Sequence, residues 1–172
     1  GVSAVLNKLV LAASGEFIRI CASDDVVVAG SSRQLLNEFR RQSGLVAVIG
    51  DAEVVDGNDN LVSKSSIGFH GGRVRRLLES RFITCELVQN YCIAGPSILI
   101  RRSHYDVMQY VPGAEIDDYK LFLSILEVPN SISFINRSVC KYRIHGENTS
   151  KTVDVARRIR NLNSYLQSID EY

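Results

Sequence analysis

The chain has 172 residues, of which 45% are hydrophobic and 23% are charged, a composition typical of one globular domain. Twenty lysines and arginines against nineteen acids leave a net charge of +1, so the overall charge does not favour nucleic acid or an anionic surface as a partner. The longest nearly uncharged apolar run, residues 92–100, is too short to cross a bilayer, and no segment typical of a signal peptide opens the chain.

Helix-type and strand-type hydrophobic patterns alternate along the chain. The predicted elements in chain order are a helix over 3–14, a strand over 16–22, a helix that starts at the N-cap candidates Ser31 and Ser32 and ends before Gly44, a strand over 45–49, a turn over 56–60, a short helix over 73–80, a strand over 97–101, a helix over 118–127, a strand over 131–136 and an amphipathic helix over 153–169. This alternation predicts a layered α/β fold in one domain, residues 1–172.

The cysteines and a group of arginines have structural rather than catalytic interpretations. Cys21, Cys85, Cys92 and Cys140 lie in apolar surroundings without a Cys-x-x-Cys pair, which indicates reduced core residues of a cytosolic protein rather than disulfides or zinc ligands. The arginines of the predicted helix over 73–80 are interpreted as a solvated face.

A first candidate site is the acidic pair Asp24 and Asp25, which follows a predicted buried strand. Ligands of open α/β sheets bind at the carboxyl ends of the strands. Adjacent carboxylates repel each other unless a cation offsets their charge, and Mg²⁺ or Mn²⁺ would do so together with a substrate diphosphate. The alternative is a solvated turn or a helix cap.

A second candidate is the acidic segment 115–119, which opens a predicted helix. Asp117 and Asp118 could stabilise the positive end of that helix by about 0.3–1 kcal/mol each. Alternatively, one carboxylate could act as a general base at the mouth of a pocket, within hydrogen-bond reach of a substrate hydroxyl.

A third candidate is the polar segment 142–150 before the last helix. His145 could bind a metal ion or a phosphate, and Arg143 could bind a diphosphate through two hydrogen bonds. The alternative is that both are ordinary surface residues.

Six segments, in this order, resemble motifs of the family 2 glycosyltransferases of the GT-A fold. The matches are 7–18 with a helix ending in A-x-G-E-Y-I, Ala22-Ser23-Asp24-Asp25 with D-S-D-D or D-A-D-D, 50–56 with Y-G-D-A-E-x-x-D, 90–102 with N-x-I-x-x-x-S-x-L-x-R-R, 117–123 with E-D-Y-D-L-W-L, and 142–150 with Y-R-I-H-G-G-N-T-S. The resemblance covers about residues 1–150.

The resemblance implies a three-layer, Rossmann-like GT-A sandwich with a mostly parallel sheet. It also implies an inverting transferase that moves a sugar from a nucleotide-diphosphate donor to an acceptor hydroxyl. Asp24, Asp25 and His145 would bind Mn²⁺ or Mg²⁺, and Asp24, Arg143 and His145 would hold the donor diphosphate. Asp118 would be the catalytic base, and Asp117 would orient the acceptor.

The chain departs from the family pattern in three ways. Ala22 replaces the first acid of the D-x-D-D motif, and Lys120 replaces a later acid, which would lower the pKa of the neighbouring base. The strands that hold the nucleotide base in the family are absent before Gly1, so the chain is interpreted as the C-terminal portion of a GT-A domain, truncated at its N-terminus. By itself it is expected to bind the donor poorly and to be inactive.

The resemblance also implies the partners and the location. The acceptor would be a saccharide or a lipid-linked sugar in bacterial cell-surface polysaccharide synthesis, at the cytoplasmic side of the plasma membrane, with peripheral membrane contact. Nucleic acid is not expected as a partner. Two alternatives remain open, a GT-A-like scaffold that binds a partner without catalysis and a metal-dependent phosphohydrolase that uses Asp24, Asp25 and His145.

Overall fold

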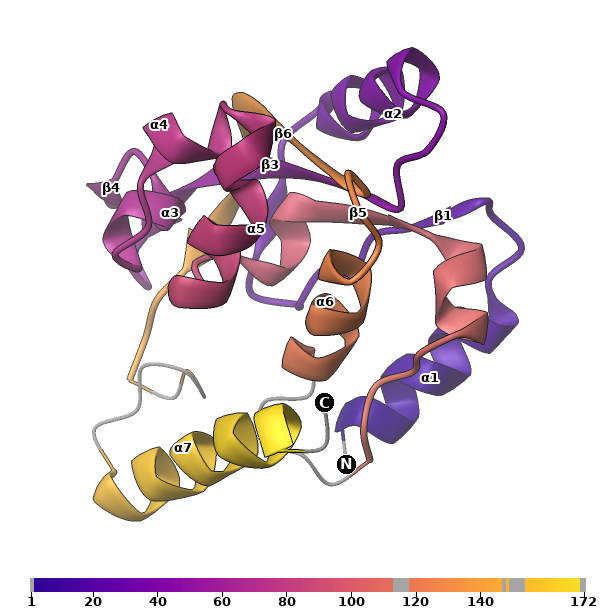
Figure 1. Ribbon diagram of the computed structural model, residues 1–172. Coiled ribbons are helices and arrows are strands. Elements are labelled where there is room, and N and C mark those ends of the chain that lie inside the picture. Colours follow the sequence, from indigo (N-terminus) through magenta and orange to yellow (C-terminus); the bar gives the residue numbers. More distant parts are fainter. Residues whose placement is uncertain (1, 113–117, 147, 149–153, 171–172) are drawn as a thin grey trace.

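A computed structural model describes residues 2–112, 118–146, 148 and 154–170 (Figure 1). The elements in chain order are α1 (Val2–Ala12), β1 (Phe17–Ile18), β2 (Val26–Val27), α2 (Ser31–Arg41), β3 (Ala47–Val55), β4 (Leu61–Ser63), α3 (Ser66–Phe69), α4 (Val74–Leu77), α5 (Ser80–Gln89), the 3-10 turn η1 (Gly95–Ser97), β5 (Ile98–Arg101), the 3-10 turn η2 (Arg102–Asp106), α6 (Tyr119–Leu126), β6 (Ile132–Arg143) and α7 (Val155–Asp170). Among these residues, no helix has both the length and the apolar character that crossing a bilayer requires.

The strands form one mixed sheet in the order β1-β5-β3-β6-β2, with β4 paired to β3 outside this path. Only β3 and β6 are parallel, and the other four strand pairs of the described residues are antiparallel. The expected α/β layers are therefore confirmed, but the expectation of a mostly parallel sheet is wrong. Continuous apolar runs such as 45–49 report burial on both faces and carry no information about the direction of the neighbouring strand.

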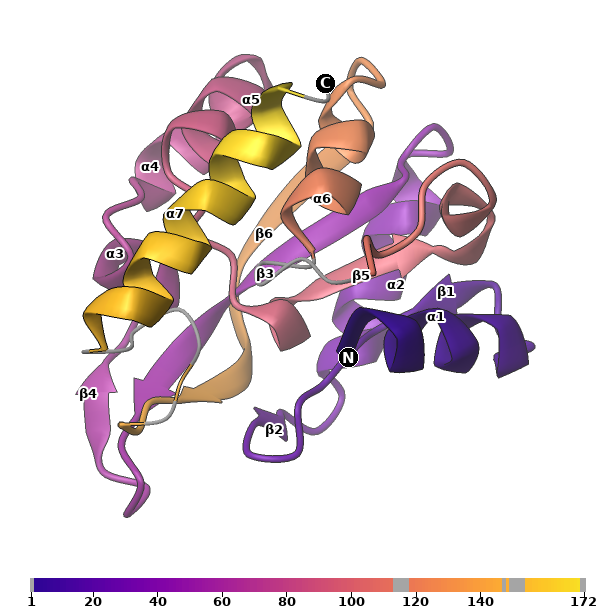
Figure 2. The same ribbon diagram turned by 90° about the horizontal axis from the view of Figure 1, so that it is seen from below.

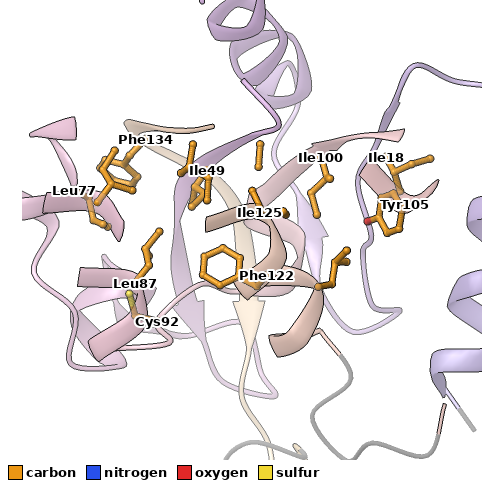
Figure 3. Packing of buried hydrophobic residues seen from close by; sticks show 14 of the residues in the cluster. Ile18, Ile49, Leu77, Leu87, Cys92, Ile100, Tyr105, Phe122, Ile125 and Phe134 are labelled. Carbon is orange, nitrogen blue, oxygen red and sulfur yellow. The ribbon is translucent and has the colours of Figure 1, made fainter. Parts of the chain in front are cut away.

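Helices cover both faces of the sheet, which gives three layers (Figures 1 and 2). On one face, Leu35 and Phe39 of α2 pack against Val48 and Ala52 of β3. On the other face, residues of α1, α3, α4, α5 and α6 pack against the opposite side of β3 and its neighbours. Figure 3 shows this larger core, where Phe122 and Ile125 of α6 lie below Ile49.

The centre of the sheet is fixed by a close approach and by a buried acid. At Gly50 a β-carbon would lie 2.5 Å from the Cγ1 atom of Val139 on β6, so only glycine fits there without a shift of Val139 or of the strands. The next residue, Asp51, is buried and accepts hydrogen bonds from the hydroxyls of Ser65 and Ser66 and from the amide of Ile67. Asp51 therefore anchors α3 to β3.

The interpretation of the arginines over 73–80 as a solvated face is incomplete, because the side chains of Arg73 and Arg76 are 58% and 27% exposed but both also pair with Glu86. Glu86 of α5 is fully buried, and its carboxylate lies 3.2 Å from the guanidinium groups of both Arg73 and Arg76. It also accepts hydrogen bonds from the amide of Arg73 and the side chain of Asn90. Helix α5 was not predicted, and with it the partner of the arginines was missed.

Three further expectations differ from the structure. The strand predicted over 16–22 is reduced to Phe17–Ile18, because only these two residues pair with β5. Ser31 does not cap α2; the N-cap is Gly30, with a φ of 75°, and both serine hydroxyls of 31–32 accept hydrogen bonds from Arg19. All four cysteines are free, but only Cys92 and Cys140 lie in the core, since Cys21 and Cys85 are exposed.

Candidate active site

The acid pair lies in the turn between β1 and β2, where β2 joins the sheet edge by pairing with β6. This pairing sets Val26 opposite Lys141 and therefore brings Asp25 next to the end of β6. The backbone amide of Arg143 donates a 2.8 Å hydrogen bond to Oδ1 of Asp25. The short strand β2, which the sequence analysis did not predict, thus positions the acid pair.

His145 meets the acid pair from a distant part of the sequence. The Nε2 atom of His145 lies 2.9 Å from Oδ2 of Asp24, and both side chains are about one-third exposed. Two segments that are separate candidates by sequence pattern, and that the resemblance assigns to one metal site, therefore form one cluster. A protonated His145 makes an ion pair with Asp24, whereas a neutral imidazole donates a single hydrogen bond.

The guanidinium of Arg143 is held within the fold. Its Nε atom donates to the carbonyl of Asp24, Nη1 donates to the carbonyl of Asp56, and Nη2 donates to Oδ1 of Asp59, at 2.7–2.8 Å. An arginine has five N–H donors, so these contacts leave one on each terminal nitrogen. Arg143 thereby ties the acid pair to the turn between β3 and β4, a role that the sequence analysis did not foresee.

Asp25 has an unusual proton affinity. Burial and, to a smaller extent, the adjacent charge of Asp24 raise its pKa to about 6, against the partial opposition of the hydrogen bond from the Arg143 amide. The repulsion between the two carboxylates that the sequence suggested is therefore present, but burial contributes more to the shift.

The donor atoms at this cluster match a divalent cation only in part. Asp24 and His145 offer one carboxylate and one imidazole within contact distance of each other, while Asp25 already accepts the Arg143 amide. Within the described part of the chain, no group of three histidine, cysteine or acid side chains is arranged to hold a metal ion. Mg²⁺ commonly uses one or two carboxylates together with substrate phosphates, so two protein ligands are sufficient only if a diphosphate completes the shell.

Asp118 lies at the start of α6 and lines an apolar cavity of about 290 Å³. The cavity wall includes Cys21 and Ala22, which directly precede the acid pair, and Tyr91, Tyr105 and Tyr110. Asp117, which was predicted to orient the acceptor, lies outside the described residues. The cavity connects the second candidate site with the chain segment that carries the first.

The carboxyl group of Asp118 is half-buried and does not cap α6. Burial raises its pKa, and a hydrogen bond from Tyr91 opposes this only in part. This direction is opposite to the one predicted from Lys120, because removal from water is the largest effect on the pKa of Asp118. A carboxylate with a raised pKa is a better proton acceptor, which is a property of catalytic bases.

Aromatic residues around Asp118 were missed by the sequence analysis. The rings of Tyr91, Tyr119 and Tyr165 lie within 4.9–6.2 Å of one another, so that α7 packs onto α6 beside Asp118. The charge of Asp118 contributes to raising the pKa of Tyr165 to about 12, although burial is the main cause. These tyrosines are scattered in the sequence, and no spacing pattern could have indicated that they meet.

A second hollow, of about 930 Å³, lies on the opposite side of the sheet between α2 and β6. It is wide and open, and none of the site residues predicted from the sequence lines it. Its walls are residues such as Asn37, Arg40 and Arg137, which form the outer surface of α2 and the bend of β6. The smaller apolar cavity is therefore the relevant one, since it contains a carboxylate with perturbed proton affinity.

Comparisons with known proteins show the fold but not a family. No family model and no curated protein matches the chain. Three crystal structures of glucosyl-3-phosphoglycerate synthase from Mycobacterium tuberculosis resemble it, with 15–16% sequence identity and TM-scores of 0.57–0.60. They hold phosphoglyceric acid, Mn²⁺ with UDP-glucose, or all three together. The matches cover 96–98% of this chain but only 54–55% of the synthase, so the chain spans about half the length of these structures.

Proposed function

We propose that the chain forms the catalytic-centre portion of a glycosyltransferase that uses a nucleotide-sugar donor. The observation that carries this proposal is the contact between Nε2 of His145 and Oδ2 of Asp24, because it joins two motifs that are 121 residues apart. The GT-A-like fold shared with the synthase supports the same assignment.

Asp24 and His145 would hold a divalent cation, Mn²⁺ or Mg²⁺, with Asp25 as the neighbouring carboxylate. When bound, such a cation neutralises the negative charge that develops on a departing diphosphate. The remaining N–H groups of Arg143 point to a supporting role on the same diphosphate. The Mn²⁺ in the synthase structures with UDP-glucose agrees with this choice of cation.

Asp118 would act as the general base. As the acceptor oxygen bonds to the anomeric carbon, its proton moves to the Asp118 carboxylate, and the bond between the sugar and the diphosphate breaks with its electrons remaining on the diphosphate. Attack opposite to the leaving group inverts the configuration at the anomeric carbon. The raised pKa of Asp118 and its position in a cavity support this role. Asp117 is proposed to orient the acceptor.

The acceptor is proposed to be a saccharide or a lipid-linked sugar of bacterial cell-surface polysaccharide synthesis, modified on the cytoplasmic side of the membrane. These finer assignments rest on the motif resemblance. The apolar and tyrosine-rich cavity beside Asp118 is compatible with the face of a sugar ring, since aromatic side chains offer apolar bodies with polar tips.

The test separates donor binding from transfer in the protein encoded by the complete gene. Calorimetry with Mn²⁺ and a panel of UDP- and GDP-sugars should give heat that requires the metal. Asp118→Asn should abolish transfer and keep donor binding, whereas Asp24→Ala combined with Asp25→Ala should lose donor binding itself. Equal loss of both properties in both variants would contradict these roles. Phosphate release without an acceptor would instead indicate a phosphohydrolase.

A second candidate is a partner-binding scaffold with the same fold and without catalysis. Three nitrogens of Arg143 are already engaged within the fold, and Ala22 stands where the motif carries an acid. Absence of metal-dependent heat with every donor, in a folded protein, would favour this candidate.

A further inference from the structure

Helix α7 exposes a stripe of apolar side chains, and its three buried residues are polar. Five apolar residues at spacings of four and three, Val155, Ile159, Leu162, Leu166 and Ile169, are 53–68% exposed. The residues of α7 that are buried against the rest of the chain are Asn161, Ser164 and Ser168. An exposed apolar stripe along a whole helix marks an interaction surface, because isolated domains normally bury such residues.

Helix α1 also exposes apolar residues, on the same side of the sheet. Val2, Val5 and Leu9 are 56–69% exposed, while Ser3 and Val10 of the same helix are buried. Figure 2 shows α1 and α7 on one side of the molecule with α6 between them. Val2 also lines the cavity that contains Asp118, so the exposed stripe of α1 is continuous with the cavity wall.

The charges on these two helices are mostly positive. Within Val155–Asp170 the sequence has three arginines, at 157, 158 and 160, and one acid, Asp170. Within Val2–Ala12 it has Lys8 and no acid. Arg158 and Arg160 are exposed and flank Ile159, so positive charges border the apolar stripe of α7 where it begins. An apolar stripe bordered by arginines is the pattern of helices that lie in the interface of an anionic membrane.

A second copy of the chain fits this surface less well. The stripe of α7 extends over about two heptads, whereas coiled coils are indicated by three to four or more. The positive charges near the start of α7 would also find no row of acids on an identical helix, since Asp170 is its only acid. Anionic headgroups supply the charge that an identical copy lacks.

We propose that the outer faces of α1 and α7 dock the protein on an anionic lipid surface, with the mouth of the Asp118 cavity turned toward that surface. The apolar side chains of both helices enter the headgroup region, and the arginines contact lipid phosphates. The proposal does not depend on sugar transfer, because lipid binding needs neither a donor nor an acceptor.

Vesicle flotation with the 172-residue chain tests the proposal. We expect the chain to float with vesicles of phosphatidylcholine and phosphatidylglycerol, less with phosphatidylcholine alone, and less as salt is added. Ile159→Glu combined with Leu162→Glu should weaken binding about tenfold or more, since two apolar contacts become charges. Arg158→Ala should weaken binding to the anionic vesicles about fivefold.

The matched control is Leu61→Glu, which introduces the same charge at an apolar residue of β4 that is 52% exposed and outside both helices. It should float as the unchanged chain does. Circular dichroism should show that all variants fold, because the replaced side chains are exposed. Failure of the unchanged chain to float, or unchanged flotation of the double variant, would overturn the proposal. A dimer in light scattering that the double variant turns into a monomer would overturn it in favour of a second copy.

Discussion

Replacing Asp25 by asparagine tests the electrostatics of the acid pair without any ligand. Asp25 is held half-buried next to Asp24, and its pKa of about 6 lies above the value of 3.8 for the free side chain. A carboxyl group whose pKa is raised on folding binds its proton more tightly in the folded state. Its ionisation therefore lowers the free energy of unfolding as the pH rises from about 4 to above 6. Asparagine stays neutral and keeps an oxygen that can accept the hydrogen bond of the Arg143 amide.

The size of the effect follows from the two pKa values. Their difference corresponds to at most about 3 kcal/mol. Because the side chain is only half-buried, water screens part of this, and we expect a gain of about 1–2 kcal/mol for Asp25→Asn near pH 7.5. For a chain of this length, a gain of 1 kcal/mol raises the melting temperature by about 2–4 °C. Near pH 4 the gain should fall to a few tenths of a kcal/mol, since the carboxyl group is then almost fully protonated in the folded state and only partly ionised in the unfolded state.

Urea unfolding at a series of pH values, with EDTA present, measures this difference directly. The matched control is Asp106→Asn, which makes the same replacement at an exposed acid at the end of η2. The reasoning is refuted if Asp25→Asn destabilises the chain near pH 7.5, or if its effect is equally large near pH 4.

Two further predictions concern the core. Glu86→Ala should lower the free energy of unfolding by about 3 kcal/mol in urea at neutral pH, because it removes the buried partner of Arg73 and Arg76. Burial raises the pKa of Glu86, but the hydrogen bonds and charge of Arg73 and the charge of Arg76 together outweigh it and hold the pKa below 4.5. The stabilisation by Glu86 is therefore lost as the pH falls through that lowered pKa. The surface pair of Glu79 with Arg81 is the control, and Glu79→Ala should cost less than about 1 kcal/mol; equal costs would contradict the assigned burial. Gly50→Ala should lower the free energy of unfolding by about 2 kcal/mol in thermal or urea unfolding, since the added β-carbon would overlap Val139. The control is Gly57→Ala, which should have little effect because nothing lies within 4 Å of the added β-carbon. An unchanged free energy of unfolding for Gly50→Ala would contradict the close approach of β3 and β6.

The sequence predicts the positions of the elements better than their partners. Apolar residues at helical spacing correctly located α1, α2 and α6. The apolar side of α2 faces the core, whereas α6 is buried on nearly all sides and Val5 and Leu9 of α1 are exposed. The apolar pattern failed for β1, whose length depends on where β5 runs beside it, and for the direction of the strands. The length of β6 was also underestimated, since its exposed middle, Asn136 to Arg137, interrupts the apolar pattern.

For the candidate site, the sequence identified groups but not their contacts. The order of the motifs suggested that residues near 24 and 145 belong to one site, and the contact of Asp24 with His145 agrees with this. The engagement of Arg143 by Asp56 and Asp59 could not be predicted, because a turn rich in acids and asparagines is equally typical of a solvated hairpin. The tyrosines around Asp118 come from three separate helices or loops, and only the tertiary fold brings them together.

The hydrogen bonds of Arg143 connect the tip of the β3–β4 hairpin to the loop that carries the acid pair. One guanidinium spans from Asp59, at the tip, to the backbone of Asp24, so any change in the hairpin is transmitted to the loop that carries both acids. Sequence drift at the tip is therefore not neutral for this protein, even though the tip is solvent-exposed. An engineer could retune the acidic loop by editing the hairpin alone and leave each of its carboxylates untouched.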